Sequence, residues 1–179
     1  MESPTQHFLE TVKFEFRRNK QLADKAIAQL KDDEIGKCNS PESNSVEVLM
    51  QHLAGNIISR WTDFLTTDGE KEWRNRDGEF ESKKMSRKDL LSQWENAWQI
   101  LFNTLNSLTV DELQKEIFIR KEPMTVTQAM LRQISHYSYH VGQIVQLAKE
   151  WKGENWNTLS IPKNKSNEHQ QGSYNGEWK

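Results

Sequence analysis

The chain has 179 residues and a mass of 21.1 kDa, a size typical of a single domain. Its 24 Lys and Arg residues against 26 Asp and Glu give a net charge of −2, which lacks the basic excess of a general nucleic-acid-binding protein. Mean hydropathy is −0.89, and no stretch approaches the roughly 20 apolar residues of a membrane span. We therefore expect neither nucleic acid nor a membrane among its partners.

Two features of the sequence favour the cytoplasm. The polar N-terminus has neither the basic start nor the apolar centre of a signal peptide. Cys38 is the single cysteine, so the chain can form neither an internal disulfide nor a cysteine-based zinc site. A reducing compartment fits this composition best.

The first helix is predicted from Ser3 to the glycine at position 36. Ser3 can act as the N-cap, Pro4 suits the first helical position, and Gln6 completes a capping box. Apolar residues then recur at helical spacing, namely Phe8, Val12, Phe16, Ala23, Ile27 and Leu30.

Two further helices follow in the middle of the chain. The second begins after Ser40-Pro41 and is predicted to end near Asp68-Gly69, and the third begins at Ser86 with Asp89 in the capping-box position. Each carries one apolar stripe, formed by Val46, Leu49, Met50, Leu53, Ile57, Trp61 and Phe64 in the second and by Leu90, Trp94, Ala97, Trp98, Leu101, Leu105 and Leu108 in the third.

The last helix is predicted from Thr125, capped with Gln128, to about Trp151, and it follows an extended connection at residues 116–120. Four amphipathic helices with one buried stripe each predict an all-α four-helix bundle over residues 1–152. Two stretches lie outside the helices: a long charged loop at residues 66–85 and a polar tail at residues 153–179, which we expect to pack on the bundle or extend from it.

Two histidines of the last helix are the first candidates for a functional site. His136 and His140 are four residues apart, close enough on a helix to share a ligand. On a helical wheel, His140 lies roughly 60° and His136 roughly 100° from the centre of the apolar stripe. Both therefore border the interior, where partial burial favours the neutral imidazole that a metal requires.

A divalent metal needs at least a third protein ligand, and His52 on the second helix is the best candidate. The wheel places His52 roughly 140° from the centre of its own stripe, so periodicity alone does not bring it to the pair. Two half-buried histidines bonded to their neighbours would explain the pair equally well. A metalloprotease is disfavoured, because Tyr137 occupies the place of the general base in H-E-x-x-H.

The charged loop offers a second candidate site. Arg74, Arg76 and Asp77 could contact a substrate anion near the mouth of the histidine site, because arginine binds carboxylates and phosphates bidentately. A solvated loop with surface ion pairs is the alternative. We interpret His7 and His169, near the termini, as ordinary surface residues.

A histidine in the second helix followed by H-x-x-x-H in the last resembles the DinB-like (DinB/YfiT-like) metal-binding superfamily. The matching stretches are 51–56 and 136–144, and residues 64–70, 74–80 and 159–162 resemble one uncharacterised bacterial subgroup of it. The resemblance implies a four-helix bundle that holds one divalent ion, commonly nickel or zinc, at His52, His136 and His140 with open positions for water.

The activities of known relatives indicate what such a site can do. Known relatives include thiol transferases and isomerases that act with low-molecular-weight thiols such as bacillithiol or mycothiol, and many others have no assigned activity. The subgroup resembled here belongs with the relatives of unassigned activity, so the resemblance implies no specific reaction. A metal-dependent hydrolase or a thiol transferase with a small-molecule thiol as substrate is one expectation. The alternative is a non-enzymatic metal-binding or stress-associated interaction protein. Relatives are often homodimers, and apolar surface near Phe118 and in the Trp-containing tail favours a homodimer here as well.

Overall fold

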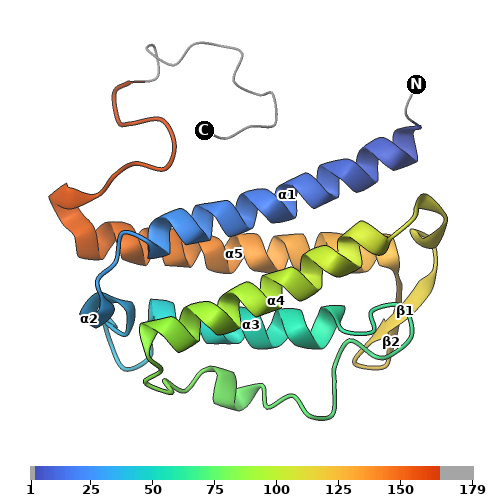
Figure 1. The fold of residues 1–179 in the computed structure, drawn as a ribbon, viewed down its shortest axis with the longest axis horizontal. Coiled ribbons are helices and arrows are strands. Elements are labelled where there is room, and N and C mark those ends of the chain that lie inside the picture. The colour runs from blue at the N-terminus through green and yellow to red at the C-terminus, as the bar shows by residue number, and fades with distance from the viewer. Residues whose placement is uncertain (1–2, 166–179) are drawn as a thin grey trace.

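The structure, a computed structural model, describes residues 3–165 and confirms the all-α four-helix bundle (Figure 1). The four long helices are α1 (Pro4–Ile27), α3 (Val46–Trp61), α4 (Arg87–Ser107) and α5 (Val126–Lys152). A short helix, α2 (Asp32–Ile35), lies between the first two. Three single 3-10 turns complete the helical part: η1 (Asp77–Glu79), η2 (Val110–Glu112) and η3 (Gly153–Asn155). None of the described helices is both long and apolar enough to cross a membrane.

The order of the helices explains why the loop is long. α1 packs along α5 and α3 packs along α4, and α5 also contacts α3. Figure 1 shows that α3 and α4 run in the same direction, so the connection at residues 62–86 returns along the whole bundle before α4 can begin. On this return path η1 contacts α3.

The predicted N-caps are confirmed at three helices. The side chains of Ser3, Ser86 and Thr125 accept hydrogen bonds from the backbone N–H groups of Gln6, Asp89 and Gln128, respectively. Each of these bonds satisfies a donor that has no partner within the helix. At the other end of α5, Gly153 has a φ of 53°, a conformation that favours glycine and ends the helix where the sequence predicted.

The first helix ends earlier than predicted, at Ile27 instead of near the glycine at position 36. Arg87 of α4 explains the break, because its guanidinium donates to the carbonyl oxygens of Ile27 (3.1 Å) and Leu30 (2.8 Å). These carbonyls therefore find partners outside the helix. Leu30 and Ile35 are nevertheless buried, which is why the apolar periodicity continues through the break.

The second helix also ends earlier, at Trp61 instead of near Asp68-Gly69. Thr62 adopts an extended conformation, Asp63 has a positive φ of 49°, and Thr104 donates to the carbonyl of Trp61 (2.9 Å). Phe64 is 5% exposed and lies against Trp61, with ring centroids 4.8 Å apart. It is a core residue of the turn after α3, so its apolar character did not mark a helix.

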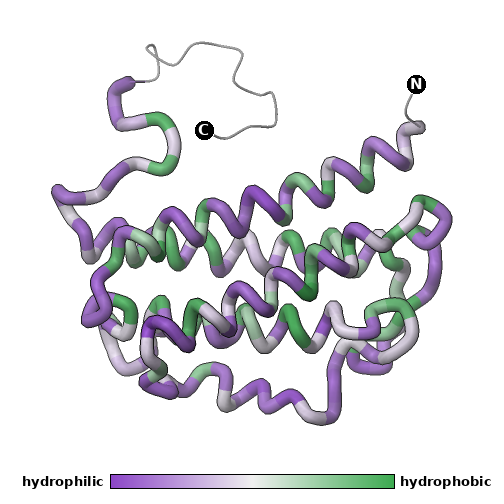
Figure 2. Tube along the Cα trace, viewed as in Figure 1, coloured by the Kyte–Doolittle hydropathy of each residue, from purple (hydrophilic) through white to green (hydrophobic). Residues whose placement is uncertain are grey.

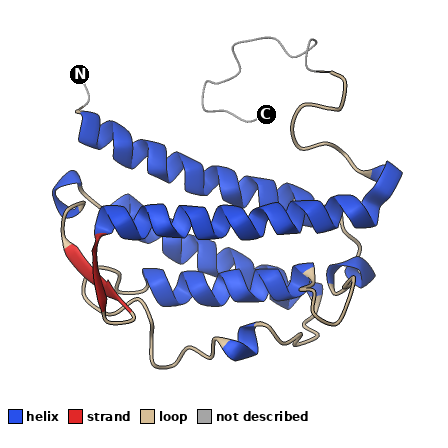
Figure 3. Ribbon diagram, turned by 180° about the vertical axis from the view of Figure 1, so that it is seen from behind, coloured by secondary structure: helices blue, strands red, loops and turns tan. Residues whose placement is uncertain are grey.

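The connection at residues 116–120 is a strand. β1 (Glu116–Ile119) pairs antiparallel with β2 (Glu122–Thr125), and the hairpin lies at the end of the bundle where α5 begins (Figure 3). Ile117 and Ile119 point into the core, whereas Phe118 between them is 44% exposed, as the two-residue period of a strand requires.

The core lies between the four long helices, along which apolar and polar residues alternate (Figure 2). Phe16, Trp61, Trp98 and Tyr137 are each at most 1% exposed and contact one another edge to face. The Tyr137 hydroxyl accepts a hydrogen bond from Trp61 (3.0 Å) and donates one to the amide oxygen of Asn56 (3.2 Å). The ring of Tyr137 is buried in the core of the bundle, and Tyr137 directly follows His136 in the sequence.

The first part of the tail contacts the bundle. Asn157 accepts a hydrogen bond from Gln29 (3.0 Å) and donates one back to it (2.8 Å), and Trp156 and Leu159 pack against the core. Residues 166–179 of the predicted tail, with His169, lie outside the described residues.

Candidate metal centre

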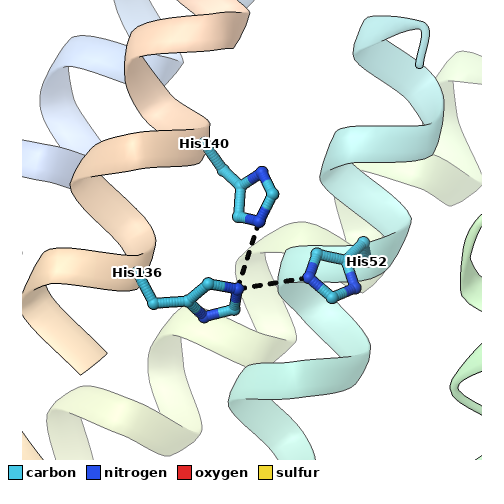
Figure 4. Close-up of side chains that lie close together, drawn as sticks. All are labelled: His52, His136 and His140. Carbon is cyan, nitrogen blue, oxygen red and sulfur yellow. Dashed lines mark hydrogen bonds between the residues drawn. The ribbon is translucent and has the colours of Figure 1, made fainter. Parts of the chain in front are cut away.

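The three predicted histidines meet between two helices. Figure 4 shows His136 and His140 projecting from α5 toward His52 on α3. The Nε2 atom of His136 lies 3.3 Å from Nε2 of His52 and 3.1 Å from Nε2 of His140. One nitrogen of each ring lies within 4.8 Å of the other two, and within residues 3–165 this is the one group of its kind among His, Cys, Asp and Glu. The structure thus forms a buried three-histidine cluster that could hold a metal.

Burial keeps the rings of α5 neutral. His52 and His140 are 3% and 8% exposed, and His136 is half-buried. Burial, together with repulsion from His140 and His52, lowers the pKa of His136 to about 3. Burial also lowers the pKa of His140, although its bond to Gln143 opposes the shift. Near pH 7 both residues therefore present a lone pair rather than a second proton.

Two rings have their outer nitrogens fixed by oxygen acceptors. Nδ1 of His52 donates to Glu79 Oε2 (3.0 Å), and Nδ1 of His140 donates to Gln143 Oε1 (2.8 Å), one turn further along α5. Burial alone would raise the pKa of Glu79, but hydrogen bonds from Arg74 and His52 outweigh it and keep this carboxyl ionised and acceptor-only. A neutral imidazole carries one N–H, so Nε2 of His52 and of His140 both expose lone pairs toward His136.

This donor set fits a divalent cation. A single proton on His136 Nε2 can satisfy one facing lone pair, whereas a cation between the rings would satisfy all three. Ligands about 2.0–2.1 Å from a tetrahedral zinc lie roughly 3.3 Å apart, and the two shortest Nε2 pairs of the cluster are separated by 3.3 and 3.1 Å. Glu79 and Gln143 occupy the outer positions at which metal-binding histidines usually donate their second N–H.

The loop residues predicted to contact an anion are not gathered into one cluster. Arg74 is buried, with 1% of its side chain exposed, and it binds the carboxylate of Glu79 through two bonds of 2.8 Å. Arg76 and Asp77 are exposed at the start of η1. The anion already beside Arg74 is thus a carboxylate of the protein itself, and contact of these three residues with a substrate stays a prediction.

Glu79, Phe80 and Gly55 also belong to this centre, although no pattern in the sequence predicted them there. Phe80 stacks on the ring of His52, with centroids 4.4 Å apart, and is 40% exposed. Gly55 makes room for Glu79, because a Cβ atom at this position would lie 2.3 Å from Glu79 Oε1. Glu79 and Phe80 reach the site only through the return path of the loop, for which the sequence contains no periodic signal.

The family of the chain follows from a comparison of its sequence. A family described as "Protein of unknown function (DUF1572)" matches residues 3–165. The chain belongs to this family. The DUF1572 match spans the four long helices, the loop and all three histidines. No curated protein matches the sequence significantly.

Proposed function

We propose that this DUF1572 protein is a DinB-like metal-binding protein that holds one divalent ion, nickel or zinc, at His52, His136 and His140. One observation carries the proposal. The outer nitrogens of His52 and His140 are fixed by Glu79 and Gln143, so the inner lone pairs converge. The free, exposed thiol of Cys38 supports a cytoplasmic location.

We propose further that the site is catalytic, as in a metal-dependent hydrolase or a low-molecular-weight-thiol transferase. His52, His136 and His140 would hold the divalent ion, which would supply Lewis acidity and make a bound water or thiol more acidic. The carboxylate bonded to His52, that of Glu79, is paired with Arg74, and within residues 3–165 no Asp, Glu or Cys joins the three histidines as an anionic ligand. This charge balance favours an anion, such as a thiolate, as the added ligand.

Two partly exposed aromatic rings lie against the histidine cluster. Tyr139 is 65% exposed and lies edge-on to His140, with ring centroids 5.0 Å apart, and Phe80 covers His52. The half-buried His136 is the ring of the cluster that solvent reaches most readily. The burial of the other two rings favours the second candidate function, a non-enzymatic metal-binding or stress-associated interaction protein.

Cobalt substitution separates these two functions. If the centre has an open position, adding bacillithiol to the cobalt-loaded protein is expected to produce an intense sulfur-to-cobalt charge-transfer band. The band requires a thiolate bonded directly to the ion, so it is expected to vanish in His52→Ala and to persist in His7→Ala. His7 is an exposed residue of α1, outside the site. A silent spectrum at millimolar thiol, in protein shown to be fully cobalt-loaded, would contradict the enzymatic proposal.

We also propose that the protein forms a homodimer. Phe118, 44% exposed at the hairpin, supplies apolar surface outside the core. Light scattering is expected to give twice the chain mass of 21.1 kDa, and Phe118→Ser is expected to shift the dimer toward monomer. A mass of one chain across a wide range of wild-type concentrations would refute the dimer.

A further inference from the structure

The loop between α3 and α4 delivers a buried carboxylate to the histidine cluster. Glu79 lies in η1, 27 residues after His52, yet its side chain is 8% exposed and bonds to Nδ1 of His52 at 3.0 Å. A buried carboxylate is costly unless it is paired and hydrogen-bonded. The contacts of Glu79 therefore show which residues stabilise its buried carboxylate beside His52.

Arg74 supplies the pairing charge. Its Nε and Nη2 atoms donate to the two oxygens of Glu79, each at 2.8 Å, in the bidentate geometry that gives strong and directional pairing. Glu70 lies on the other side of Arg74, at 3.4 Å, and it also accepts from Arg60 of α3 (2.8 Å) and Arg120 of the hairpin turn (3.0 Å). The chain of ion pairs thus fastens the loop to both α3 and the hairpin.

Gly55 allows the carboxylate to approach α3. It lies on α3 three residues after His52, and a methyl group there would overlap Glu79 Oε1 at 2.3 Å and its carboxyl carbon at 2.7 Å. Because Arg74 holds both carboxylate oxygens, Glu79 cannot turn aside without breaking that pair. The absence of a side chain at position 55 is therefore a requirement of the His52–Glu79 contact.

We propose that Glu79 is a positioning residue that orients His52 for metal binding, and that Arg74 and Gly55 hold Glu79 in place. Residues 62–86 are on this view a structural part of the metal centre. The inference rests on the proposed function for the identity of the ligand, whereas the His52–Glu79 contact exists without it. By donating Nδ1–H to a carboxylate, His52 keeps its lone pair on Nε2 and becomes a more basic ligand.

The first test measures zinc affinity by competition with a chromophoric chelator. Glu79→Ala and Gly55→Ala are expected to weaken zinc binding by about 10–100-fold, the usual cost of losing an outer-shell partner of a ligand histidine. Gly55→Ala removes no functional group, so its effect reports the displaced carboxylate alone. Glu81→Gln, an exposed carboxylate of the same loop, serves as the control and is expected to bind zinc as tightly as the wild type. Unchanged affinity in Glu79→Ala and Gly55→Ala would overturn the inference.

A second test needs no metal. Long-range proton–nitrogen NMR of the metal-free protein is expected to show the His52 ring protonated on Nδ1, and to show this preference lost in Glu79→Ala. Hydrogen exchange at residues 62–86 is expected to accelerate in Arg74→Met, because the ion-pair chain is broken. If the wild type binds no zinc but these results appear, the proposed function fails while Glu79 remains the residue that orients His52. An Nδ1–H that persists without Glu79 would refute the positioning role.

Discussion

Replacement of His136 with alanine is expected to abolish retention of a divalent ion while leaving a folded bundle. His136 is the ring that both other ligands approach, at 3.3 and 3.1 Å, so its loss leaves two nitrogens that are no longer bridged. The affinity is expected to fall by more than the ~10–100-fold typical of outer-shell partners. His136 is half-buried and lies outside the apolar core, so its truncation removes little packing.

Elemental analysis of protein purified without chelator or a histidine tag measures this effect directly. The wild type is expected to hold close to one divalent ion per chain, and His7→Ala, the matched control on α1, is expected to hold the same amount. Circular dichroism checks that the helices of each variant are intact. Equal metal content in His136→Ala and the wild type would contradict the assignment of the site.

The bundle could be predicted from local signals, because three N-caps and four apolar stripes each depend on residues that are close together in the sequence. Ser3, Ser86 and Thr125 cap the helices as predicted. Helix ends set by distant side chains could not be predicted. Arg87 donates to the carbonyls of Ile27, the last residue of α1, and of Leu30 just after it, and Thr104 donates to the last carbonyl of α3. Both donors lie on α4, and the local sequence pattern does not show that α4 packs against the ends of α1 and α3.

His52 illustrates where the helical wheel fails. The wheel assumes one buried face, but every residue of α3 except Gly55 and Ile58 is buried, because α4, α5 and the loop surround this helix. An angle from the centre of the apolar stripe then says little about which side chain faces which neighbour. The pair on α5 was easier to place, since four-residue spacing brings two histidines together within one helix.

The contacts of charged residues in the loop could not be predicted from the sequence. Arg74 was predicted to contact a substrate anion, and its place beside Glu79 depends on a path of about 25 residues that returns along the bundle. Arginine and glutamate five positions apart in a loop carry no information about burial. Only the fold determines that this pair is buried against His52 while Arg76 and Asp77 stay exposed.

Mild acid is expected to destabilise the metal-free protein through its histidines, at a higher pH than that at which the ion pairs of Glu70 and Glu79 are lost. The pKa of His136 is lowered to about 3 and that of His140 is also lowered, both chiefly by burial. Below the unfolded value of about 6.5, the unfolded chain therefore binds protons that the folded protein does not. The free energy of unfolding is expected to fall by up to about 1.4 kcal/mol per pH unit for each histidine, until the pH reaches its folded pKa.

The carboxylates act in a separate and lower window. Hydrogen bonds from arginine outweigh burial and lower the pKa of Glu79 and, to about 2, that of Glu70. The stability that they contribute is present above the unfolded value of about 4.5 and is lost only as the pH falls from there toward the folded value. The interval between about pH 6.5 and 4.5 therefore reports the histidines rather than the ion pairs of the loop.

Urea titrations of the chelator-treated protein at pH 7 and pH 5 measure this loss. His136→Gln removes one of the two imidazoles whose pKa is lowered and is expected to reduce the difference between the two pH values. Glu81→Gln, in the exposed part of the loop, is expected to leave the difference unchanged. Zinc-loaded protein is expected to lose stability at pH 5 as well. The unfolded chain binds protons on these histidines at pH 5, whereas the histidines that bind metal in the folded protein must stay unprotonated. Equal free energies of unfolding at pH 7 and pH 5 in the metal-free wild type would show that the cluster accepts protons in the folded state.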